Sequence, residues 1–437
     1  MSGEATTFAP DFKEAPYWWE AAPPLDIAAP PLPASIDVAI VGAGLTGLNA
    51  ALILARAGRS VAVFDAGALG QGASSRNAGY VGRSLKHSFG DLMRRHGVAR
   101  AIAVYREMQA AFDAVIEVLR TESIDCAFRR CGRFIMTRSS RQYEDLAAEL
   151  ELRRTHLGDE FTMVSRASMC SEIATDRFSG GAIIPDLGAI HPGLYQRGLL
   201  ARALALGVTL IGQTPVQQMS GGGAAGGFDL TTPRGALRAR DVLLATNGYT
   251  GGLLPWLKRR VIPFEAYMIA TEAIEPATMN RLLPTDRTYI DHAHNIDFMR
   301  PSPDGTRILF GGRTGSRSSS VRSKAVELRN CAARIIAELG EMKLTHAWTG
   351  RCAATFDLYP HIGVRNGVHY AGGYCFAGIP MGTYLGRKAA YRILGLPEAE
   401  TIFAARGFPT APLYSGNPWF VPYAMAYYDW RDHRESR

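Results

Sequence analysis

The sequence predicts a mixed α/β fold (α/β and α+β combined), and three observations support it. Residues 37–41 and 60–64 are short apolar runs typical of buried strands, and residues 45–57 between them have helical spacing. A strand, a helix and a second strand in that order form a βαβ unit. Residues 91–155 then look mostly helical, whereas residues 261–312 alternate as strands do. The chain therefore combines a parallel α/β region with a region rich in sheet.

Composition limits the classes of protein to which this chain can belong. Its 437 residues suffice for two intertwined domains, and 47% hydrophobic with 20% charged residues exclude a wholly disordered, collagen-like or coiled-coil chain. The formal net charge is +8, but the arginines are scattered rather than gathered in a patch, so we expect no nucleic-acid partner. The six cysteines have neither CxxC nor metal-ligand spacing, so we expect no metal site.

The location of the protein can also be predicted from its sequence. The longest apolar stretch, residues 38–55, contains three glycines and is not expected to span a membrane. Residues 1–10 lack the charged and apolar regions of a signal peptide. We therefore expect a soluble cytoplasmic protein without a disulfide framework.

The remaining elements follow in chain order. Residues 1–35 are rich in alanine and proline, and we expect the aromatic run 17–19 to pin this segment to the body of the protein. Gly58 is predicted to end the first helix, because glycine readily adopts the left-handed conformation that follows a helix. The aromatic tail 416–430 is predicted to be a helix packed on its own protein. Further strands are predicted at 208–216, 228–230, 241–246, 308–312 and 367–371, and further helices at 321–340 and 381–394.

Residues 42–47 read Gly-Ala-Gly-Leu-Thr-Gly, which is the GxGxxG pattern of a dinucleotide-binding turn. Gly42 makes the turn, Gly44 lets the backbone approach a pyrophosphate, and Gly47 lets the helix pack closely on the strand. Asp65 closes the second strand about 20 residues later, where its carboxylate can accept hydrogen bonds from ribose hydroxyls. The helix N-terminus supplies free N–H groups to the phosphates. Together these features predict a Rossmann-like dinucleotide site.

A second stretch, residues 221–226, also satisfies GxGxxG. The residues after it, 228–230, look like a strand and not a helix, so we interpret this stretch as a hairpin turn without a nucleotide. The chain therefore carries one dinucleotide fingerprint, and no second one is predicted for NAD(P)H.

Residues 70–79 form a loop rich in small and hydroxyl residues, with one arginine and one asparagine. Such a loop suits a second phosphate and a ring system, and an NAD-binding domain does not need it there. The other stretches that carry the resemblance described next are 17–19, 41–48, 191–192, 245–250, 298–300, 308–313, 348–350, 355–357 and 360–363. Together they resemble the FAD-dependent amine and amino-acid oxidoreductases of the D-amino-acid oxidase, glycine oxidase and sarcosine oxidase type, in particular the γ-glutamylputrescine oxidase-like branch.

The resemblance implies a Rossmann-like FAD-binding domain interleaved with a substrate domain built from a β-sheet and helices. Non-covalent FAD is expected, because the position of the flavin-tethering cysteine in sarcosine-oxidase-type relatives falls on Gly350, and Cys352 is out of register. The FAD-binding domain would comprise residues 1–90, 150–250 and 345–437, and the substrate domain residues 91–149 and 251–344.

The resemblance also assigns an FAD site by position. The ADP half is expected at Gly42, Gly44, Thr46, Gly47, Asp65 and Ala66, with the backbone of Val216 at the adenine. The pyrophosphate and flavin are expected at Gly72, Ala73, Ser74, Ser75, Arg76, Asn77, Ala78 and Gly79. The remaining assigned residues are Thr246, Asn247, Gly373, Gly378, Ile379, Met381, Gly382 and Thr383, the last six at the pyrimidine edge of the flavin. A glycine-rich loop before a helix also points N–H groups at that edge, where reduced flavin carries negative charge.

The sequence departs from the family pattern at two positions. Relatives that oxidise simple α-amino acids often carry an arginine two residues after the glycine of a Trp-x-Gly motif, and that position is Cys352 here. Arg351 lies beside it, but neighbouring strand residues point to opposite faces. A carboxylate clamp is therefore not expected, and a simple α-amino acid is a less favoured substrate. The Ser-Gly-His of the loop beside the flavin is replaced by Cys-Phe-Ala at 375–377.

Four residues are candidates for the substrate pocket, with catalytic roles in view: His292, His294, Arg300 and Tyr267. Each has an ordinary alternative, namely a surface or hydrogen-bonded histidine, a structural ion pair for the arginine, and simple packing for the tyrosine. Tyr249 and His87 are weaker candidates.

These features predict FAD-dependent oxidation of the C–N bond of an amine or amino-acid derivative. Hydride would pass from the α-carbon to flavin N5, and the imine would then be hydrolysed. The lost clamp favours a substrate with a long polar arm, such as γ-glutamylputrescine, and O2 is the expected acceptor, giving H2O2. Two alternatives stay open: a dehydrogenase that passes electrons to a quinone or a partner protein, and a catalytically silent flavin-binding subunit of a larger complex. We expect a monomer or a small homo-oligomer.

Overall fold

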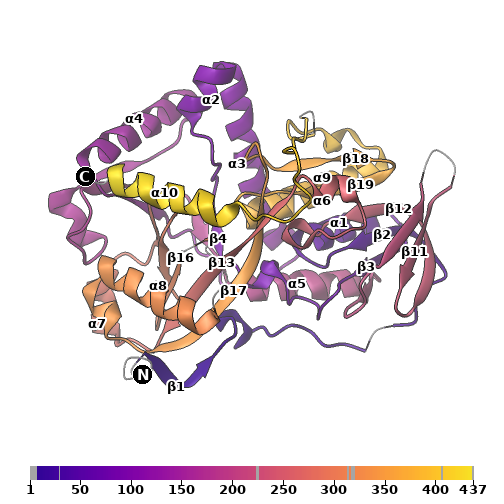
Figure 1. The fold of residues 1–437 in the computed structure, drawn as a ribbon, viewed down its shortest axis with the longest axis horizontal. Helices are drawn as coiled ribbons and strands as arrows, with labels where there is room; N and C mark the ends of the chain where they lie inside the picture. The colour runs from indigo at the N-terminus through magenta and orange to yellow at the C-terminus, as the bar shows by residue number, and fades with distance from the viewer. Residues whose placement is uncertain are drawn as a thin grey trace.

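The computed structural model describes residues 7–28, 30–222, 226–312, 314–315, 320–404 and 407–435. Residues 223–225 of the second glycine stretch and Arg313 of the motif 308–313 lie outside these ranges. The described part is built around two large β-sheets, which lie on opposite sides of the molecule in Figure 1. In this part of the chain, no helix is both long and apolar enough to cross a membrane.

The first sheet has a parallel centre formed by β2 (Ser35–Val41), β3 (Val61–Phe64), β9 (Thr209–Ile211) and β12 (Gly235–Leu244). Two hairpins extend it at β12, namely β10 (Gln218–Gly221) with β11 (Phe228–Thr232), and β18 (His361–Arg365) with β19 (Val368–Gly372). The helices packed on this sheet are α1 (Leu45–Arg56), α5 (Pro192–Ala205) and α9 (Gly378–Leu394). Because α1 packs against both α5 and α9, the three helices form one layer.

The second sheet has nine strands in the order β1-β17-β13-β16-β15-β14-β5-β7-β6. Their bounds are β1 (Phe8–Lys13), β5 (Arg133–Thr137), β6 (Thr162–Ser165), β7 (Gly180–Ile184), β13 (Ile262–Thr271), β14 (Thr288–Asp291), β15 (Phe298–Pro301), β16 (Ile308–Gly312) and β17 (Leu344–Ala354). The helices α7 (Pro276–Leu282) and α8 (Val321–Ile335) cover one face of this sheet, and their apolar side chains share one core with it.

The remaining elements connect the two sheets. The short strands β4 (Tyr80–Val81) and β8 (Gly188–Ala189) pair with each other between them. The other helices are α2 (Phe89–His96), α3 (Val98–Thr121), α4 (Ser140–Leu157), α6 (Pro255–Lys258) and α10 (Val421–Glu435). Helix α3 packs against α9, and α10, drawn in yellow in Figure 1, crosses the side of the second sheet. The predicted tail helix is therefore present and contacts its own protein.

The predicted βαβ unit is confirmed by β2, α1 and β3, and Gly58, with φ of +75°, follows the end of α1. The range 91–155 is mostly helical, as predicted, and it also contains strand β5, whose five residues are too few to show a period between two long helices. Other predictions differ from the structure. The range 261–312, predicted to alternate as strands, includes helix α7, and the strand predicted at 208–216 covers only residues 209–211. The helix predicted at 321–340 ends at Ile335, because Ile336 turns to φ of −127°, and a 3-10 turn follows it.

The strands do not follow the predicted domain limits everywhere. β6 and β7 lie within 150–250, β1 lies within 1–90, and most of β17 lies within 345–437, yet all four belong to the second sheet. The pairing of a short strand depends on its cross-strand neighbours, which are distant in the sequence, and not on its own residues. The division into domains itself stays a prediction.

A small apolar cluster joins the N-terminal run to the second sheet. It contains Trp18, Met268, Leu309 and Trp348, each exposed by 4% or less. Trp18 belongs to a 3-10 turn near the N-terminus, and the other three belong to β13, β16 and β17. The aromatic run 17–19 is thus pinned to the body of the protein, as predicted, and its contacts include the second sheet.

Candidate active site

The three glycines of the 42–47 turn are each required by close neighbours. Gly42 has φ of +112°, and a Cβ there would lie 2.7 Å from the carbonyl oxygen of Ala245. A Cβ at Gly47 would overlap the carbonyl oxygen of Gly42. At Gly44 the neighbour is a flexible side chain, because a Cβ would lie 2.8 Å from Oγ of Ser74. Gly42 and Gly47 therefore fix the turn itself, whereas Gly44 keeps the space before the helix open.

The N-terminus of α1 faces the 70–79 loop. The N–H of Leu45 donates to Oγ of Ser74 over 3.1 Å, so an oxygen stands directly before the first turn of the helix. N–H groups in a first helical turn have no partner within the helix and attract anionic oxygen. A phosphate oxygen in this place would take the same donor. The residues present therefore fit the pyrophosphate of a dinucleotide such as FAD.

Asp65 lies at the end of β3, beside the same turn. One of its carboxylate oxygens accepts the N–H of Ala43 and the other accepts that of Gly67, each at 3.0 Å. Burial raises the pKa of Asp65, and the two N–H groups oppose that rise. Each oxygen keeps a further lone pair, which a ribose hydroxyl can use. Asp65 is thus suited both to fixing the turn and to binding a ribose.

A second helix N-terminus lies near the first. Helix α9 packs so closely on α1 that a Cβ at Gly386 would overlap the carbonyl oxygen of Thr46. The hydroxyl groups of Thr46 and Tyr374, which precedes α9, share a hydrogen bond of 2.5 Å. Oδ1 of Asn247 accepts the N–H of Gly373 over 2.9 Å. The structure thus brings together the turn, the 246–247 segment and the 373–383 segment, three parts of the FAD site assigned from the sequence.

Three indole groups hold the 70–79 loop from outside, and one of them, that of Trp19, donates through Nε1 to Oγ of Ser75 over 3.0 Å. Nε1 of Trp348, on β17, donates to the carbonyl oxygen of Arg76, and Nε1 of Trp18 donates to that of Asn77, each over 2.8 Å. A buried indole N–H needs an acceptor, and here the acceptors are carbonyl groups of this loop. The N-terminal run therefore helps to shape a loop that lies 59 residues further along the chain.

Arg300, a predicted substrate residue, holds the next part of the same loop. Its Nη1 donates to the carbonyl oxygen of Ile190 over 2.8 Å, and to those of Ala78 and Gly79 over 3.4 Å each. The side chain is 1% exposed, and burial lowers its pKa to about 10. Among the described residues, Arg300 has no carboxylate partner, and its Nη2 has no hydrogen bond. This geometry supports a structural role, and a role in substrate binding stays a prediction.

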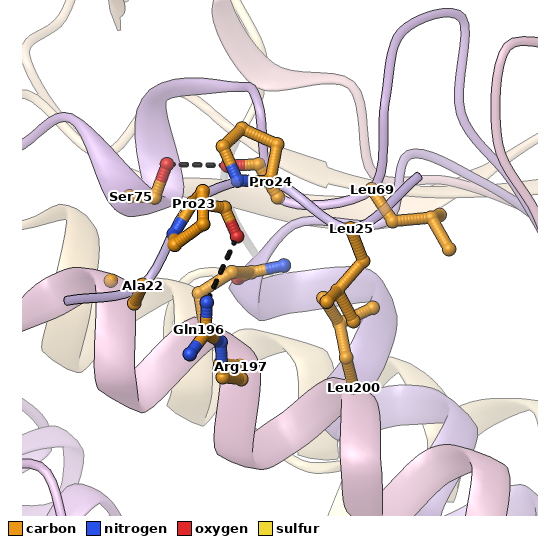
Figure 2. Close-up of a pocket in the computed structure, with 11 residues that line it drawn as sticks. Ala22, Pro23, Pro24, Leu25, Leu69, Ser75, Gln196, Arg197 and Leu200 are labelled. Atoms are coloured by element: carbon orange, nitrogen blue, oxygen red, sulfur yellow. Dashed lines mark hydrogen bonds between the residues drawn. The ribbon is translucent and has the colours of Figure 1, made fainter. Parts of the chain in front are cut away.

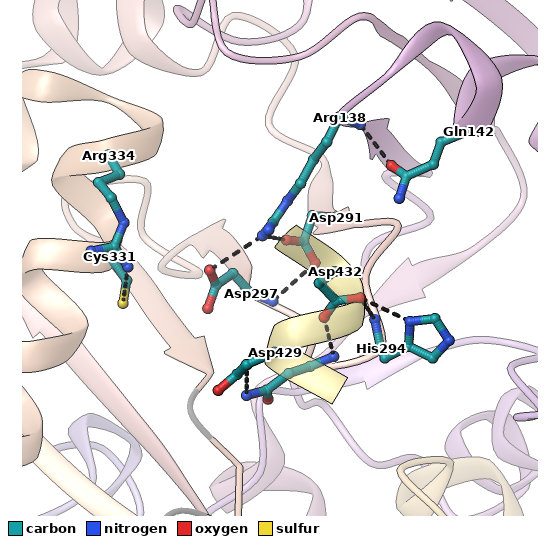
Figure 3. Close-up of polar contacts among 10 residues, drawn as sticks. Arg138, Gln142, Asp291, His294, Asp297, Cys331, Arg334, Asp429 and Asp432 are labelled. Carbon is teal, nitrogen blue, oxygen red and sulfur yellow. Dashed lines mark hydrogen bonds and ion pairs between the residues drawn. The ribbon is translucent and has the colours of Figure 1, made fainter. Parts of the chain in front are cut away.

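The two predicted histidines lie near α10 and differ in their surroundings. Figure 3 shows Nδ1 of His294 beside Asp432 of α10, at 2.8 Å from Oδ1, and the backbone N–H of His294 also donates to that oxygen. The ring of His294 stacks on Tyr428. His292 is exposed, and its backbone N–H donates to the carbonyl oxygen of Met136. The hydrogen-bonded alternative therefore describes His294, and sequence reasoning missed its partner Asp432.

Tyr267 points away from the 70–79 loop. It lies in the core between the second sheet and α8, with the ammonium of Lys324 6.0 Å from its ring centroid. Met268, the next residue, belongs to the apolar cluster around Trp18, on the opposite face. Of the four predicted substrate residues, Arg300 is thus the one that contacts the loop within the described part of the chain.

The face of β13 and β17 that looks toward the loop consists of three register pairs. They are Met268 with Trp348, Ala266 with Gly350, and Phe264 with Cys352. A Cβ at Gly350 would lie 3.3 Å from Cβ of Arg76, which shows that this face meets the loop. Arg351 is turned the other way, with Nη2 3.6 Å from Oε1 of Glu265. The clamp position therefore holds the Cys352 thiol, whose pKa burial raises to about 12.

The segment that replaces Ser-Gly-His has an unusual backbone. Cys375 and Phe376 have φ of +47° and +78°, a region that residues other than glycine rarely adopt. The ring of Phe376 packs on that of Phe264, with 5.1 Å between the centroids. Burial raises the pKa of Cys375 to about 11, so this side chain is a thiol at neutral pH. Such backbone conformations cost on the order of 1–3 kcal/mol each and are concentrated at functional sites.

The two weaker candidates lie in different places. Nε2 of His87 lies 2.8 Å from the carbonyl oxygen of Asp357, and its ring stacks on Tyr359. His87 also lines a pocket of about 280 Å³ beside α2. Tyr249 is 47% exposed and lies beneath the guanidinium of Arg351 on β17, and a Cβ at Gly72 would lie 3.9 Å from its ring. The structure therefore brings Tyr249 beside β17 and the 70–79 loop, and a role in substrate binding stays a prediction.

A small cavity lies beside the 70–79 loop, with Gly70 and Ser75 among its lining residues (Figure 2). It measures about 10 Å³, roughly the space of one water molecule, between the N-terminal residues 22–25 and α5. Nε2 of Gln196 donates to the carbonyl oxygen of Ala43 over 2.6 Å, and in the described part of the chain its Oε1 has no partner. The N-terminal segment therefore packs next to the 42–47 turn without leaving room there for an organic ligand.

Comparison with known proteins shows similarity over most of the chain. The family described as DAO, FAD dependent oxidoreductase, matches residues 37–392. The probable oxidoreductase OrdL of Haemophilus influenzae is 28% identical, over 87% of this chain and 87% of that protein. The gamma-glutamylputrescine oxidoreductase of Escherichia coli is 27% identical, over 91% of this chain and 92% of that protein. The crystal structure of glycine oxidase from Geobacillus kaustophilus has a TM-score of 0.72 at 23% identity, covering 87% of this chain and 99% of that one.

Proposed function

The chain belongs to the DAO family of FAD-dependent oxidoreductases, and from this premise we propose that it oxidises the C–N bond of an amine with a long polar arm. The observation that carries the substrate class is Cys352, which lies on the face toward the 70–79 loop where an arginine clamp would be needed for a simple α-amino acid. The similarity to the gamma-glutamylputrescine oxidoreductase of Escherichia coli supports the same class, because γ-glutamylputrescine is an amine with such an arm.

Different residues of the chain would bind the pyrophosphate and the ribose of FAD. The N–H of Leu45 and the hydroxyl of Ser74 would hold the pyrophosphate, and Asp65 would hold the ribose. When bound, FAD supplies the acceptor for a hydride from the carbon beside the nitrogen, and water then hydrolyses the imine of the substrate to a carbonyl compound. Trp18 and Trp348 keep the 70–79 loop in place during this reaction.

The protein also favours the reactive form of the substrate. An amine can lose hydride only when its nitrogen is neutral, and an apolar surrounding disfavours the charged ammonium form. The rings of Phe264 and Phe376 supply such a surrounding, and Phe264 is the register partner of Cys352. No strong base from the protein is required in this account, and His292, His294, Arg300 and Tyr267 remain predicted substrate residues.

The electron acceptor is the second part of the proposal. We infer that O2 takes the two electrons and two protons and leaves as H2O2. An enzyme that passes electrons to a quinone or a partner protein would instead be reoxidised slowly by air. A catalytically silent subunit would keep its flavin oxidised with every amine.

An anaerobic panel tests this proposal. The purified yellow protein is mixed without oxygen with γ-glutamylputrescine, putrescine, glycine and sarcosine, and the flavin absorbance is followed. Bleaching by γ-glutamylputrescine is expected, and admission of air should restore the colour and form H2O2. An unchanged flavin with all four compounds would contradict the proposed reaction, and bleaching without rapid recovery in air would contradict O2 as the acceptor.

A further inference from the structure

Lys86 lies in the segment between β4 and α2 and reaches the edge of the candidate site. Its ammonium nitrogen is 4.5 Å from the ring centroid of Phe376. Phe376 in turn packs on Phe264, whose register partner on β17 is Cys352. The ring of Phe376 therefore contacts both the ammonium and Phe264, which pairs with the position where the arginine clamp is absent.

Among the described residues, this ammonium has no direct ion-pair partner. Among the described residues, Lys86 makes no hydrogen bond or ion pair, whereas the ammonium groups of Lys13, Lys324 and Lys388 all have oxygen partners. Lys86 is half-buried, and burial lowers its pKa. A cation that is partly removed from water without a partner is costly, and an anion placed beside it would offset that cost.

The neighbours of Lys86 include one carboxylate, that of Asp432, which opposes the effect of burial on the pKa of Lys86 but makes no ion pair with it in the described part of the chain. The oxygens of Asp432 are turned to other donors, because one accepts the N–H of His294 and the other accepts that of Asn295. Cys375, the other neighbour, is a buried thiol. The contact with Phe376 holds the ammonium in place without neutralising it, since an aromatic face attracts a cation but carries no net charge.

We propose that Lys86 is the anchor for a carboxylate at the far end of the amine substrate. Two rings separate this charge from the clamp position. The ring centroids of Phe264 and Phe376 are 5.1 Å apart, and the ammonium nitrogen lies 4.5 Å from the centroid of Phe376. A carboxylate bound there is separated from the reacting carbon by several bonds, unlike the carboxylate of an α-amino acid. The inference rests on the proposed function, and it adds that the polar arm carries a carboxylate and that Lys86 binds it.

Binding of an unreactive carboxylate tests this anchor without any turnover. The holoenzyme is titrated by calorimetry with hexanoate and with hexanamide, which has the same length and no charge. Lys86→Met should weaken hexanoate binding by about tenfold or more, because a hydrogen bond to a charged group is lost. Lys86→Arg should stay within about threefold of the parent, since the charge is kept. Lys343→Met, at an exposed lysine at the start of β17, is the matched control and should bind like the parent.

Kinetics with two amines provide the second readout. Lys86→Met should raise the KM for γ-glutamylputrescine by about tenfold at unchanged kcat, and should leave putrescine, which has no carboxylate, unaffected. The proposal is overturned if hexanoate fails to bind the parent, if Lys86→Met binds it equally well, or if this variant loses only its reoxidation by air. If no amine reduces the flavin, the proposed function fails, and the hexanoate titration still decides whether Lys86 binds a carboxylate.

Discussion

The phosphate half and the flavin half of the proposed FAD site are built in different ways. At the phosphate half, the donor Leu45 and the glycines belong to one turn, and the partner Ser74 is 29 residues away. At the flavin half, the 70–79 loop is held by Trp18 and Trp348, and Trp348 is 272 residues from the carbonyl group that it binds. The first half depends on backbone geometry, whereas the second depends on long-range packing. Substitutions in the phosphate half should therefore act through the backbone geometry of the turn, and those in the flavin half through the packing that holds the loop.

The largest effect is expected at the turn itself. Gly47→Ala should lower the free energy of unfolding by about 3 kcal/mol, because the added Cβ would overlap a backbone carbonyl that cannot move aside. Urea unfolding of the protein without FAD measures this change. Gly58→Ala is the comparison variant, since Gly58 has φ of +75° but no atom within 4 Å of its Cβ position, and the strained backbone alone should cost only about 1 kcal/mol. Equal losses in the two variants would show that close packing at Gly47 is unimportant.

The next effect separates binding from folding. Gly44→Ala meets only the flexible side chain of Ser74, so the free energy of unfolding without FAD should change by less than about 1 kcal/mol. The methyl group would still stand where the pyrophosphate approaches α1, and the Kd for FAD should rise about 100-fold. Fluorescence titration with FAD measures it. An unchanged Kd would place the pyrophosphate elsewhere.

At the flavin half, the expected effect is smaller and acts through the loop. Trp18→Phe keeps the ring but removes the N–H that binds the carbonyl oxygen of Asn77, and one unpaired buried carbonyl costs about 1–3 kcal/mol. The Kd for FAD should rise about tenfold. Trp419→Phe, at a tryptophan that is 68% exposed, is the control and should leave the Kd as it is. If both variants bind FAD alike, the indole does not shape the loop.

The smallest expected effect is the dependence on pH of the contact that Asp432 of α10 makes with the rest of the protein. Hydrogen bonds from His294 and Asn295 hold the pKa of Asp432 below its usual range, although burial opposes them. A carboxyl group with a lowered pKa stabilises the folded state above its unfolded pKa of about 3.9, and that stability is lost as the pH falls through the folded value. Contact between α10 and residues 294–295 should therefore persist at pH 5 and weaken only below about pH 4.

Hydrogen exchange of the α10 segment, corrected for the intrinsic effect of pH, measures this contact. In Asp432→Asn, the amide hydrogens of α10 should exchange faster than in the parent at pH 7, and their corrected exchange rate should no longer rise in acid. Identical exchange in the two proteins at pH 7 would mean that Asp432 does not hold α10 in place.

The contrast between the two halves also explains what the sequence could and could not predict. The 42–47 turn and Asp65 follow from local spacing, because the fingerprint lies within one βαβ unit, although Gly42 and Leu45 also contact Ala245 and Ser74 outside it. The contacts of Trp18 and Arg300 with the loop, and of Asp432 with His294, join segments that are distant in the sequence, so the sequence could not pair them. Tyr267 lies in the range predicted to alternate as strands, but periodicity alone could not tell which face of β13 meets the loop. Cys352 was assigned to the clamp position by its spacing from the Trp-x-Gly motif of the resemblance.

The most direct test of the central claim compares two rates of flavin bleaching without oxygen. γ-Glutamylputrescine and glycine are mixed in turn with the parent holoenzyme, and the decrease of flavin absorbance is timed. The account predicts bleaching by γ-glutamylputrescine that is at least about 100-fold faster at equal concentration, since a carboxylate clamp for glycine is missing at Cys352. Faster bleaching by glycine, or none by either compound, would contradict it.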